Sequence, residues 1–179
     1  MQRVAIVVFL LAAAVLLLEV LPPSVIGAPP PVPEGQDKSE QSLAIVVNQS
    51  NPVENLSFVE LRRIFMGERS HWPNGRRITL VMMEAGQAER KAVLRDIYQM
   101  NETDFNNHFL QGVFTGEVFV SPKTLATSAG VCKFVFNVPG AIGYVRASTV
   151  EGSVKVVRID GHLPDDKDYR LHLQARSGK

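Results

Sequence analysis

The sequence predicts an α/β fold, a three-layer sandwich whose mostly parallel or mixed sheet has roughly four to five strands. Short apolar runs rich in β-branched residues are bounded by turn residues, which is typical of strands. Between them lie stretches whose apolar residues recur at helical spacing. Strands and helices that alternate in this way form a sheet covered on both faces. The 179-residue chain is long enough for one such domain.

The strands are assigned to the apolar runs. The run at 43–47, LAIVV, has no polar position, as expected for a strand buried on both faces. Pro73-Asn74-Gly75 is a turn signal that leads into the next run. In chain order, the predicted strands are residues 43–47, 78–83, 141–145 and 154–159, followed by an edge strand at 169–173.

The helices are assigned from apolar spacing and cap signals. Ser57 stands three residues before Glu60, a capping box that starts a helix ending at Gly67. A second helix is predicted from about 87 to 100.

Two further helices follow in the second half of the chain. One begins after Thr103, and its inward residues are predicted to be Phe105, Phe109 and Val113. Ser121-Pro122 resembles an N-cap followed by proline at the first helical position, so the last helix is predicted to start there and run to about Phe136.

The N-terminus predicts export. A basic Arg3, a long apolar run and a small-residue stretch follow one another in the order of a secretory signal peptide. Residues 1–27 are therefore a cleaved signal or a retained membrane anchor, and the protein is periplasmic or tethered to the inner membrane. Residues 28–41 are predicted to be a flexible proline-rich linker. A domain at 42–162 and a C-terminal edge strand and tail at 163–179 complete the organisation.

Composition excludes several classes of function. The net charge is +1, with 19 basic and 18 acidic residues, so the sequence predicts no nucleic-acid binding. The single cysteine, Cys132, allows no intrachain disulfide and is expected in the core. No pair of histidines has the spacing of a zinc-hydrolase motif. We predict no metal, no cofactor and no enzymatic activity.

Several motifs in order carry a family resemblance. They are SNPVENLSFVELRRIFMG at 50–67, W-x-N-G at 72–75, FTGE at 114–117, and PGAIGYV at 139–145 followed by VKVV. This series resembles the second lobe of the phosphate-binding proteins of ABC transporters, and more closely a family of short, single-lobe, secreted phosphate-binding-like proteins. The resemblance implies one lobe of a type 2 periplasmic binding protein, with Trp72 packing a turn. It does not by itself imply a ligand.

The resemblance also implies where an anion would bind. In the phosphate-binding relatives this lobe supplies an arginine at the end of a strand and Ser-Gly-Thr at the start of the next helix. These positions correspond here to Met83 and to Gln87, Ala88 and Glu89, so all of them differ. A carboxylate at Glu89 would repel an anion by about 4 kcal/mol at 4 Å in an effective dielectric near 20. We therefore expect a degenerate pocket.

The candidate ligand-binding residues are those that remain. Gly86 suits a tight strand-to-helix turn, Gln87 can donate through its amide, and Arg90 lies one turn into the helix. Ser50 and Asn51, which open the first motif, complete the set. The alternative is that Glu89 only favours the helix dipole and that Arg90 is a solvated helix residue.

Two functions fit these observations. The first is a secreted or periplasmic solute-binding-like module that holds a small anion such as phosphate weakly or in an altered way. The second is a ligand-free interaction module for an envelope protein or membrane complex. A homodimer through the face that would meet the absent lobe is a further expectation.

Overall fold

The computed structural model describes residues 41–118 and 121–173. The predicted signal or anchor at 1–27, and the predicted linker at 28–41 except for Gln41, lie outside these residues. None of the helices in the described ranges combines the length and the apolar character that a membrane crossing needs.

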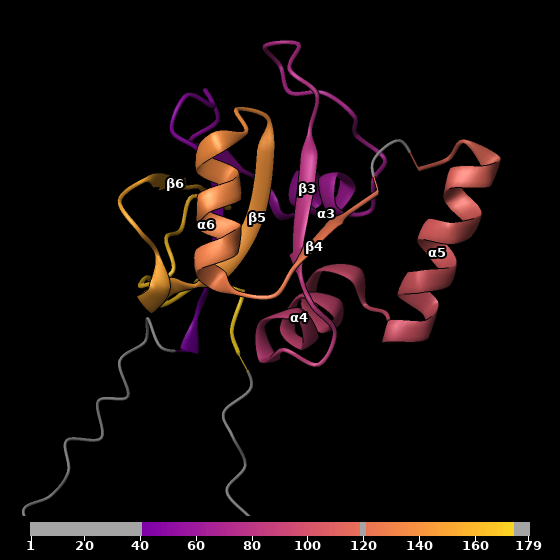
Figure 1. The fold of residues 1–179 in the computed structure, drawn as a ribbon. Coiled ribbons are helices and arrows are strands. Elements are labelled where there is room, and N and C mark those ends of the chain that lie inside the picture. Colours follow the sequence, from indigo (N-terminus) through magenta and orange to yellow (C-terminus); the bar gives the residue numbers. More distant parts are fainter. Residues whose placement is uncertain (1–40, 119–120, 174–179) are drawn as a thin grey trace, which may run out of the picture. The chain divides into compact units, whose positions relative to one another are not determined.

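The centre of the fold is a five-stranded mixed sheet in the order β4-β3-β5-β1-β6 (Figure 1). β3 pairs in parallel with both β4 and β5, whereas β1 is antiparallel to β5 and β6. The strands are β1 Leu43–Asn48, β3 Thr79–Met83, β4 Lys123–Leu125, β5 Ala141–Arg146 and β6 Val154–Val156. Every residue of β1 is buried, which is why its sequence is an unbroken apolar run.

Helices cover both faces of the sheet, which confirms the three-layer sandwich. They are α3 Phe58–Phe65, α4 Ala88–Val93, the π-helix η1 Leu94–Tyr98, α5 Glu102–Thr115 and α6 Ser128–Asn137. α6 packs on β5, β1 and β3, and α3 lies behind the sheet (Figure 1). Alternate residues of β5 face these two layers: a Cβ at Gly143 would meet Val131 of α6, whereas Tyr144 packs on Phe65 of α3.

The predicted α3 is confirmed in detail. Ser57 is its N-cap, and its side chain and that of Glu60 bond to each other's backbone N–H groups in a capping box. The predicted second helix is α4, which continues into η1 and ends at Gln99 in the left-handed region (φ 57°).

Two predictions in the second half of the chain are wrong. Val113 is 51% exposed, because Phe105, Phe109 and Gly112 form the inward face of α5. No helix starts at Ser121-Pro122, because the next residues form β4 beside β3. α6 starts later, at the N-cap Thr127, whose hydroxyl accepts from the Gly130 N–H at 3.0 Å.

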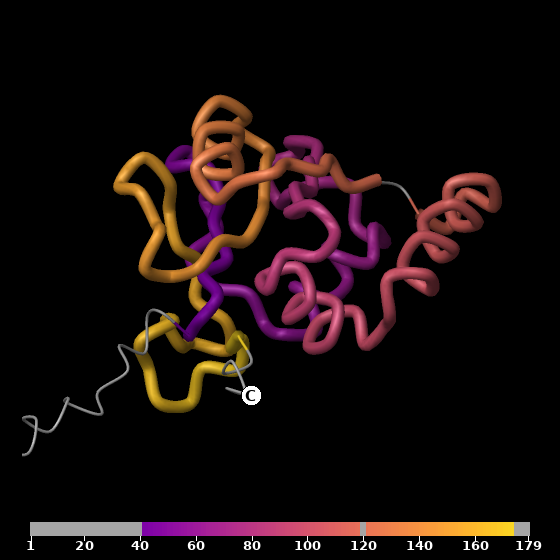
Figure 2. The backbone as a smooth tube through the Cα atoms, turned by 60° about the horizontal axis from the view of Figure 1, so that its bottom comes forward, coloured from indigo at the N-terminus to yellow at the C-terminus, as the bar shows by residue number. Residues whose placement is uncertain are grey.

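The C-terminal part of the chain forms shorter strands than predicted. The run at 154–159 divides into β6 and a short strand, β7 Arg158–Ile159, which pairs with β2 Asn55–Leu56 in a second sheet. The predicted edge strand at 169–173 is reduced to a bridge between Ser42 and His172. Figure 2 shows this last segment beside the start of β1.

Candidate functional site

The corner between β3 and α4 is where the resemblance places an anion. Met83 ends β3, and Gln87 is the N-cap of α4 but makes no side-chain cap bond. Gly86 between them has φ 90°, a conformation that L side chains rarely adopt. The strand-to-helix corner that the sequence predicts is therefore present, with Gly86 and Gln87 exposed on it.

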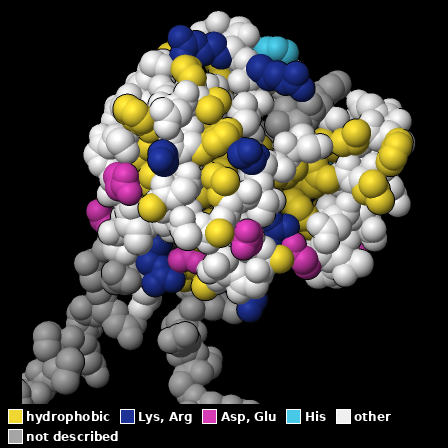
Figure 3. All heavy atoms as spheres, viewed as in Figure 1, with side chains coloured by type: hydrophobic (Ala, Val, Ile, Leu, Met, Phe, Trp, Pro, Cys, Tyr) yellow, Lys and Arg dark blue, Asp and Glu magenta, His cyan; other side chains and the backbone are white. Residues whose placement is uncertain are grey.

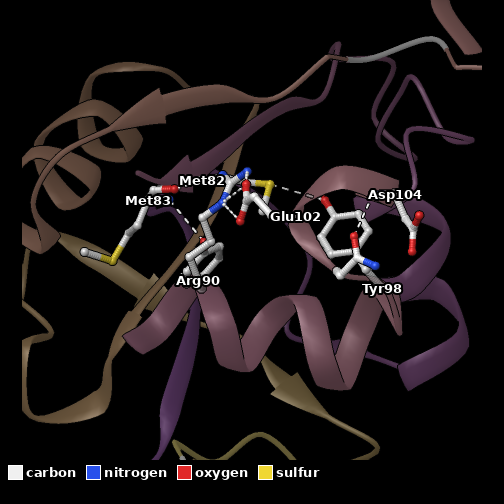
Figure 4. Close-up of polar contacts among 8 residues, drawn as sticks. Met82, Met83, Arg90, Tyr98, Glu102 and Asp104 are labelled. Atoms are coloured by element: carbon white, nitrogen blue, oxygen red, sulfur yellow. Dashed lines mark hydrogen bonds and ion pairs between the residues drawn. The ribbon is translucent and has the colours of Figure 1, made fainter. Parts of the chain in front are cut away.

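Arg90 lies in the interior of this corner rather than in solvent, which excludes the solvated alternative (Figure 4). Its Nη1 donates to the Met83 carbonyl at 3.0 Å. Its Nε lies 2.9 and 3.1 Å from the two carboxylate oxygens of Glu102, and Nη2 also contacts Glu102. The guanidinium stacks on the Phe105 ring at 4.7 Å. A carboxylate of the protein itself therefore binds one edge of this guanidinium, through Nε and Nη2.

Glu89 is the second charged residue buried at the corner. Arg146, at the end of β5, places Nε and Nη2 at 3.1 and 3.0 Å from Glu89 Oε1. Glu89 is thus matched by a cation from the neighbouring strand and does more than favour the dipole of α4. Both ion pairs at the corner, Arg90–Glu102 and Arg146–Glu89, thus join residues of the chain itself.

An aromatic cluster adjoins the Arg90–Glu102 pair, because the Phe105 ring on which Arg90 stacks belongs to it. Tyr98 packs edge-on against Phe105, with ring centroids 4.9 Å apart, and its hydroxyl donates to the Phe65 carbonyl at 2.8 Å. The Tyr144 hydroxyl accepts from the Met83 N–H at 3.1 Å. Burial raises the pKa of both tyrosines, so both remain neutral near pH 7. Tyr144 therefore holds the end of β3 by a hydrogen bond, Tyr98 ties η1 to the end of α3, and neither phenol carries a charge near pH 7.

Ser50 and Asn51 do not join this corner. They follow the end of β1, where Val47 lies opposite Ile142, and Leu80 near the start of β3 pairs with the same residue. Met83 ends β3 at the other edge of the sheet. Ser50 instead accepts from Arg76 at 2.9 Å. The buried Asn51 Nδ2 has no hydrogen-bond partner among the described residues. The predicted ligand-binding residues therefore lie at opposite ends of the strands: Ser50 and Asn51 at one end, and Gly86, Gln87 and Arg90 at the other.

A groove adjoins the corner on the side of η1. Its volume is about 540 Å³, and its lining is mainly apolar. Ala85, Gly86, Lys91, Leu94, Arg95, Gln99, Met100, Asn101 and Glu102 line it. Within the described residues, no three His, Cys, Asp or Glu side chains are grouped so that they could hold a metal ion.

Sequence reasoning misses Glu102 and this groove. Glu102 begins α5, and its acidic side chain reads as an ordinary first-turn residue, while the Asn101 side chain caps the helix through the Asp104 N–H at 2.9 Å. Nothing local in the sequence indicates that Glu102 reaches back to Arg90. The π-helical turn that shapes the groove has no signal either, since its apolar residues fit an α-helix equally well.

Comparison with known proteins supports the fold. No protein-family model matches the chain. An ABC-type phosphate transport receptor from Vibrio cholerae is 24% identical, and the match covers 69% of this chain and 48% of that one with a TM-score of 0.57. A putative phosphate ABC transporter substrate-binding protein with bound phosphate, from Clostridium perfringens, is also 24% identical, covering 68% and 46% with a TM-score of 0.55.

A third solved structure is similar over about the same share of this chain. A phosphate-binding protein from Stenotrophomonas maltophilia is 17% identical, and the match covers 70% of this chain and 40% of that one with a TM-score of 0.51. The chain thus spans less than half the length of the solved proteins that it matches. At these identities the likeness concerns the fold. The described part of the chain has the fold of the matched part of these phosphate-transporter substrate-binding proteins, as expected for a single-lobe α/β sandwich.

Proposed function

We propose that the chain is an exported solute-binding-like module, related to the phosphate-binding proteins of ABC transporters, whose degenerate anion pocket holds phosphate weakly. The fold likeness to phosphate-binding proteins supports solute binding. The apolar N-terminal sequence supports export, either as a periplasmic protein or tethered to the inner membrane. The function is binding and includes no catalytic step.

The proposal depends most on one observation, the hydrogen-bonded ion pair between Arg90 and Glu102. An anion needs a guanidinium with free N–H groups, but Arg90 directs its donors to the Glu102 carboxylate and the Met83 carbonyl. Phosphate would have to displace a tethered carboxylate. Glu102 thus occupies the place of the ligand, and the affinity for free phosphate is low.

Titration calorimetry with phosphate tests this proposal. The full-length chain should bind with a Kd no tighter than about 1 mM, near 4 kcal/mol. Glu102→Ala should bind phosphate at least about tenfold more tightly, because the guanidinium then has donors to offer. Glu102→Gln, which keeps a hydrogen-bond acceptor, should fall between the two and serves if the alanine variant folds poorly.

Asp104→Ala is the matched control. It removes another carboxylate from the first turn of α5, and Figure 4 places Asp104 apart from Arg90. This variant should bind phosphate like the unmodified chain. Micromolar phosphate binding by the unmodified chain would contradict a degenerate pocket. Equal affinities for all four proteins would show that Glu102 does not close the site.

A ligand-free interaction module remains the second candidate, favoured by the outer face of α5. Leu110, Val113 and Phe114 recur at helical spacing on this face and are exposed, Phe114 by 84%. Figure 3 shows apolar side chains gathered over α5. Such a face fits an envelope partner or a second copy of the chain.

Light scattering and capture from envelope extract test the second candidate. A homodimer through this face should appear as concentration rises and should be lost in Phe114→Ser, because the most exposed apolar ring is removed. A chain that stays monomeric at high concentration, and that recovers only itself from envelope extract, would contradict the interaction module.

A further inference from the structure

We infer that the groove beside the corner binds a small carboxylic acid with an apolar body. The inference rests on the proposed solute-binding function and names the class of ligand. It concerns the space between α4, η1 and the start of α5, next to the guanidinium that Glu102 occupies.

The groove has the dimensions and the floor of a small-molecule site. Its volume of about 540 Å³ lies within the range of roughly 300 to 1,000 Å³ that such sites span. Leu94, Met100 and Ala85 supply apolar surface. Phosphate, which has no apolar body, would leave that surface in contact with water. A ligand with several methylene groups or a ring would bury it, at about 25 cal/mol per Å².

The backbone of η1 holds this floor in place. The Met100 N–H donates to the Leu94 carbonyl at 3.1 Å, which closes the turn after the π-helix. Gln99 sits inside that turn in the left-handed region. The chain therefore reverses direction between Leu94 and Met100, and the two side chains line the same groove. Single π-helical turns of this kind are frequent at functional sites.

The charges around the groove favour a monoanion. Arg95 is neutralised by Asp96, with two contacts of 2.6 Å, and Arg90 is neutralised by Glu102. Lys91 is exposed at the groove and has no ion pair or side-chain hydrogen bond with any residue in the described ranges. One uncompensated cation therefore faces the groove, which matches a single carboxylate.

Two uncharged polar side chains, Gln99 and Asn101, also line the groove, and Asn101 offers a donor. Asn101 uses its side-chain oxygen to accept from the Asp104 N–H, so only its amide N–H₂ is left for a ligand. Lys91 and Asn101 together offer donors to an oxyanion beside an apolar floor. Their number is small for a phosphate dianion, which must be fully hydrogen-bonded once it is desolvated.

Methyl NMR of the full-length chain with octanoate tests the inference. The chain has five methionines, so ¹³C-methyl labelling gives few and separate signals. Octanoate should shift the Met100 methyl with a saturating curve and leave unchanged that of Met66, the C-cap of α3, which does not line the groove. Octanol, which has the same body without the charge, should bind at least about tenfold more weakly. Phosphate should leave the Met100 methyl in place.

Lys91→Met should weaken octanoate binding at least about fivefold and leave octanol binding unchanged, because it removes the charge and keeps the apolar stem. Lys133→Met on α6 makes the same change away from the groove and should have no effect. An unshifted Met100 methyl, or equal octanoate binding by Lys91→Met, would overturn the inference. If Glu102→Ala nevertheless gains phosphate affinity, the proposed function stands and only the carboxylate ligand is wrong. If both responses are absent, both proposals fail.

Discussion

The two members of the ion pair between Arg90 and Glu102 differ in their exposure to solvent. The Arg90 side chain is 5% exposed and that of Glu102 is 38% exposed. Removing the carboxylate would leave a guanidinium buried without a counter-charge, whereas removing the guanidinium would leave a carboxylate that water can reach. Glu102→Ala should therefore lower the free energy of unfolding by about 3 kcal/mol, and Arg90→Met by only about 1 to 2 kcal/mol.

Urea unfolding of the two variants and of their combination measures this difference. The double variant should be more stable than Glu102→Ala alone, because no unpaired cation remains. Arg63→Ala serves as the control, since its contact with Glu68 is 3.7 Å long and exposed, and it should change stability by less than about 1 kcal/mol. Equal losses for Arg90→Met and Glu102→Ala would contradict an electrostatic origin of the difference.

At the scale of elements, the first glycine of the PGAIGYV motif, Gly140, lies where the backbone at Arg77 leaves no room for a side chain. A Cβ on Gly140 would lie 2.0 Å from the Arg77 carbonyl oxygen, which belongs to the backbone and cannot turn away. The Gly140 carbonyl also accepts from the indole of Trp72 at 2.9 Å and from the Thr79 N–H at 3.0 Å. Trp72 thus packs the turn as predicted. Gly140→Ala must separate the start of β3 from β5.

Gly140→Ala should lower the free energy of unfolding by at least about 2 to 3 kcal/mol, as overpacking against rigid atoms does. Gly152→Ala is the matched control, because a Cβ there meets nothing within 4 Å, and it should be nearly neutral. Thermal unfolding of both variants measures the difference. A Gly140→Ala protein as stable as the control would show that the Arg77 carbonyl can move freely.

The elements that local signals encode are those that the sequence predicts. α3 is set by its own capping box, and β1 is recognisable because burial on both faces demands an apolar run. β4 escapes prediction because its residues are polar or half-buried and it pairs with β3, far earlier in the chain. Pro122, which suits a first helical position, precedes a strand instead.

The candidate site is less predictable for the same reason. Gly86 and Gln87 follow from the strand-to-helix pattern and lie on the predicted corner. The burial of Arg90 depends on Glu102, and the distance between the corner and Ser50 and Asn51 depends on β1 running antiparallel to β5. Strand direction and contacts between distant residues are properties of the assembled sheet, and no local motif records them.

At the scale of the whole molecule, the described part of the C-terminal segment, up to residue 173, belongs to the core. The Leu43 N–H donates to the Leu171 carbonyl at 3.0 Å, and the Tyr169 hydroxyl donates to the Leu43 carbonyl at 2.6 Å. Tyr169 and Leu171 are buried. Ending the chain after His162 should therefore cost at least about 4 kcal/mol of unfolding free energy, measured in urea. A shortened chain of unchanged stability would contradict a role of Tyr169 and Leu171 in the core.

The tyrosines make the stability of the whole domain sensitive to alkali. All three, Tyr98, Tyr144 and Tyr169, are buried, and desolvation raises the pKa of each above its usual value near 10. Below pH 10 the phenols are neutral in both the folded and unfolded states, so their contribution to stability is complete. Above pH 10 only the unfolded chain loses these protons, and stability falls by up to about 4 kcal/mol per pH unit until the folded-state pKa values are reached. Absorbance should therefore show no phenolate until the chain unfolds, and then a single cooperative rise that coincides with loss of circular dichroism. A gradual rise near pH 10, like that of the chain in denaturant, would mean that at least one phenol is open to water.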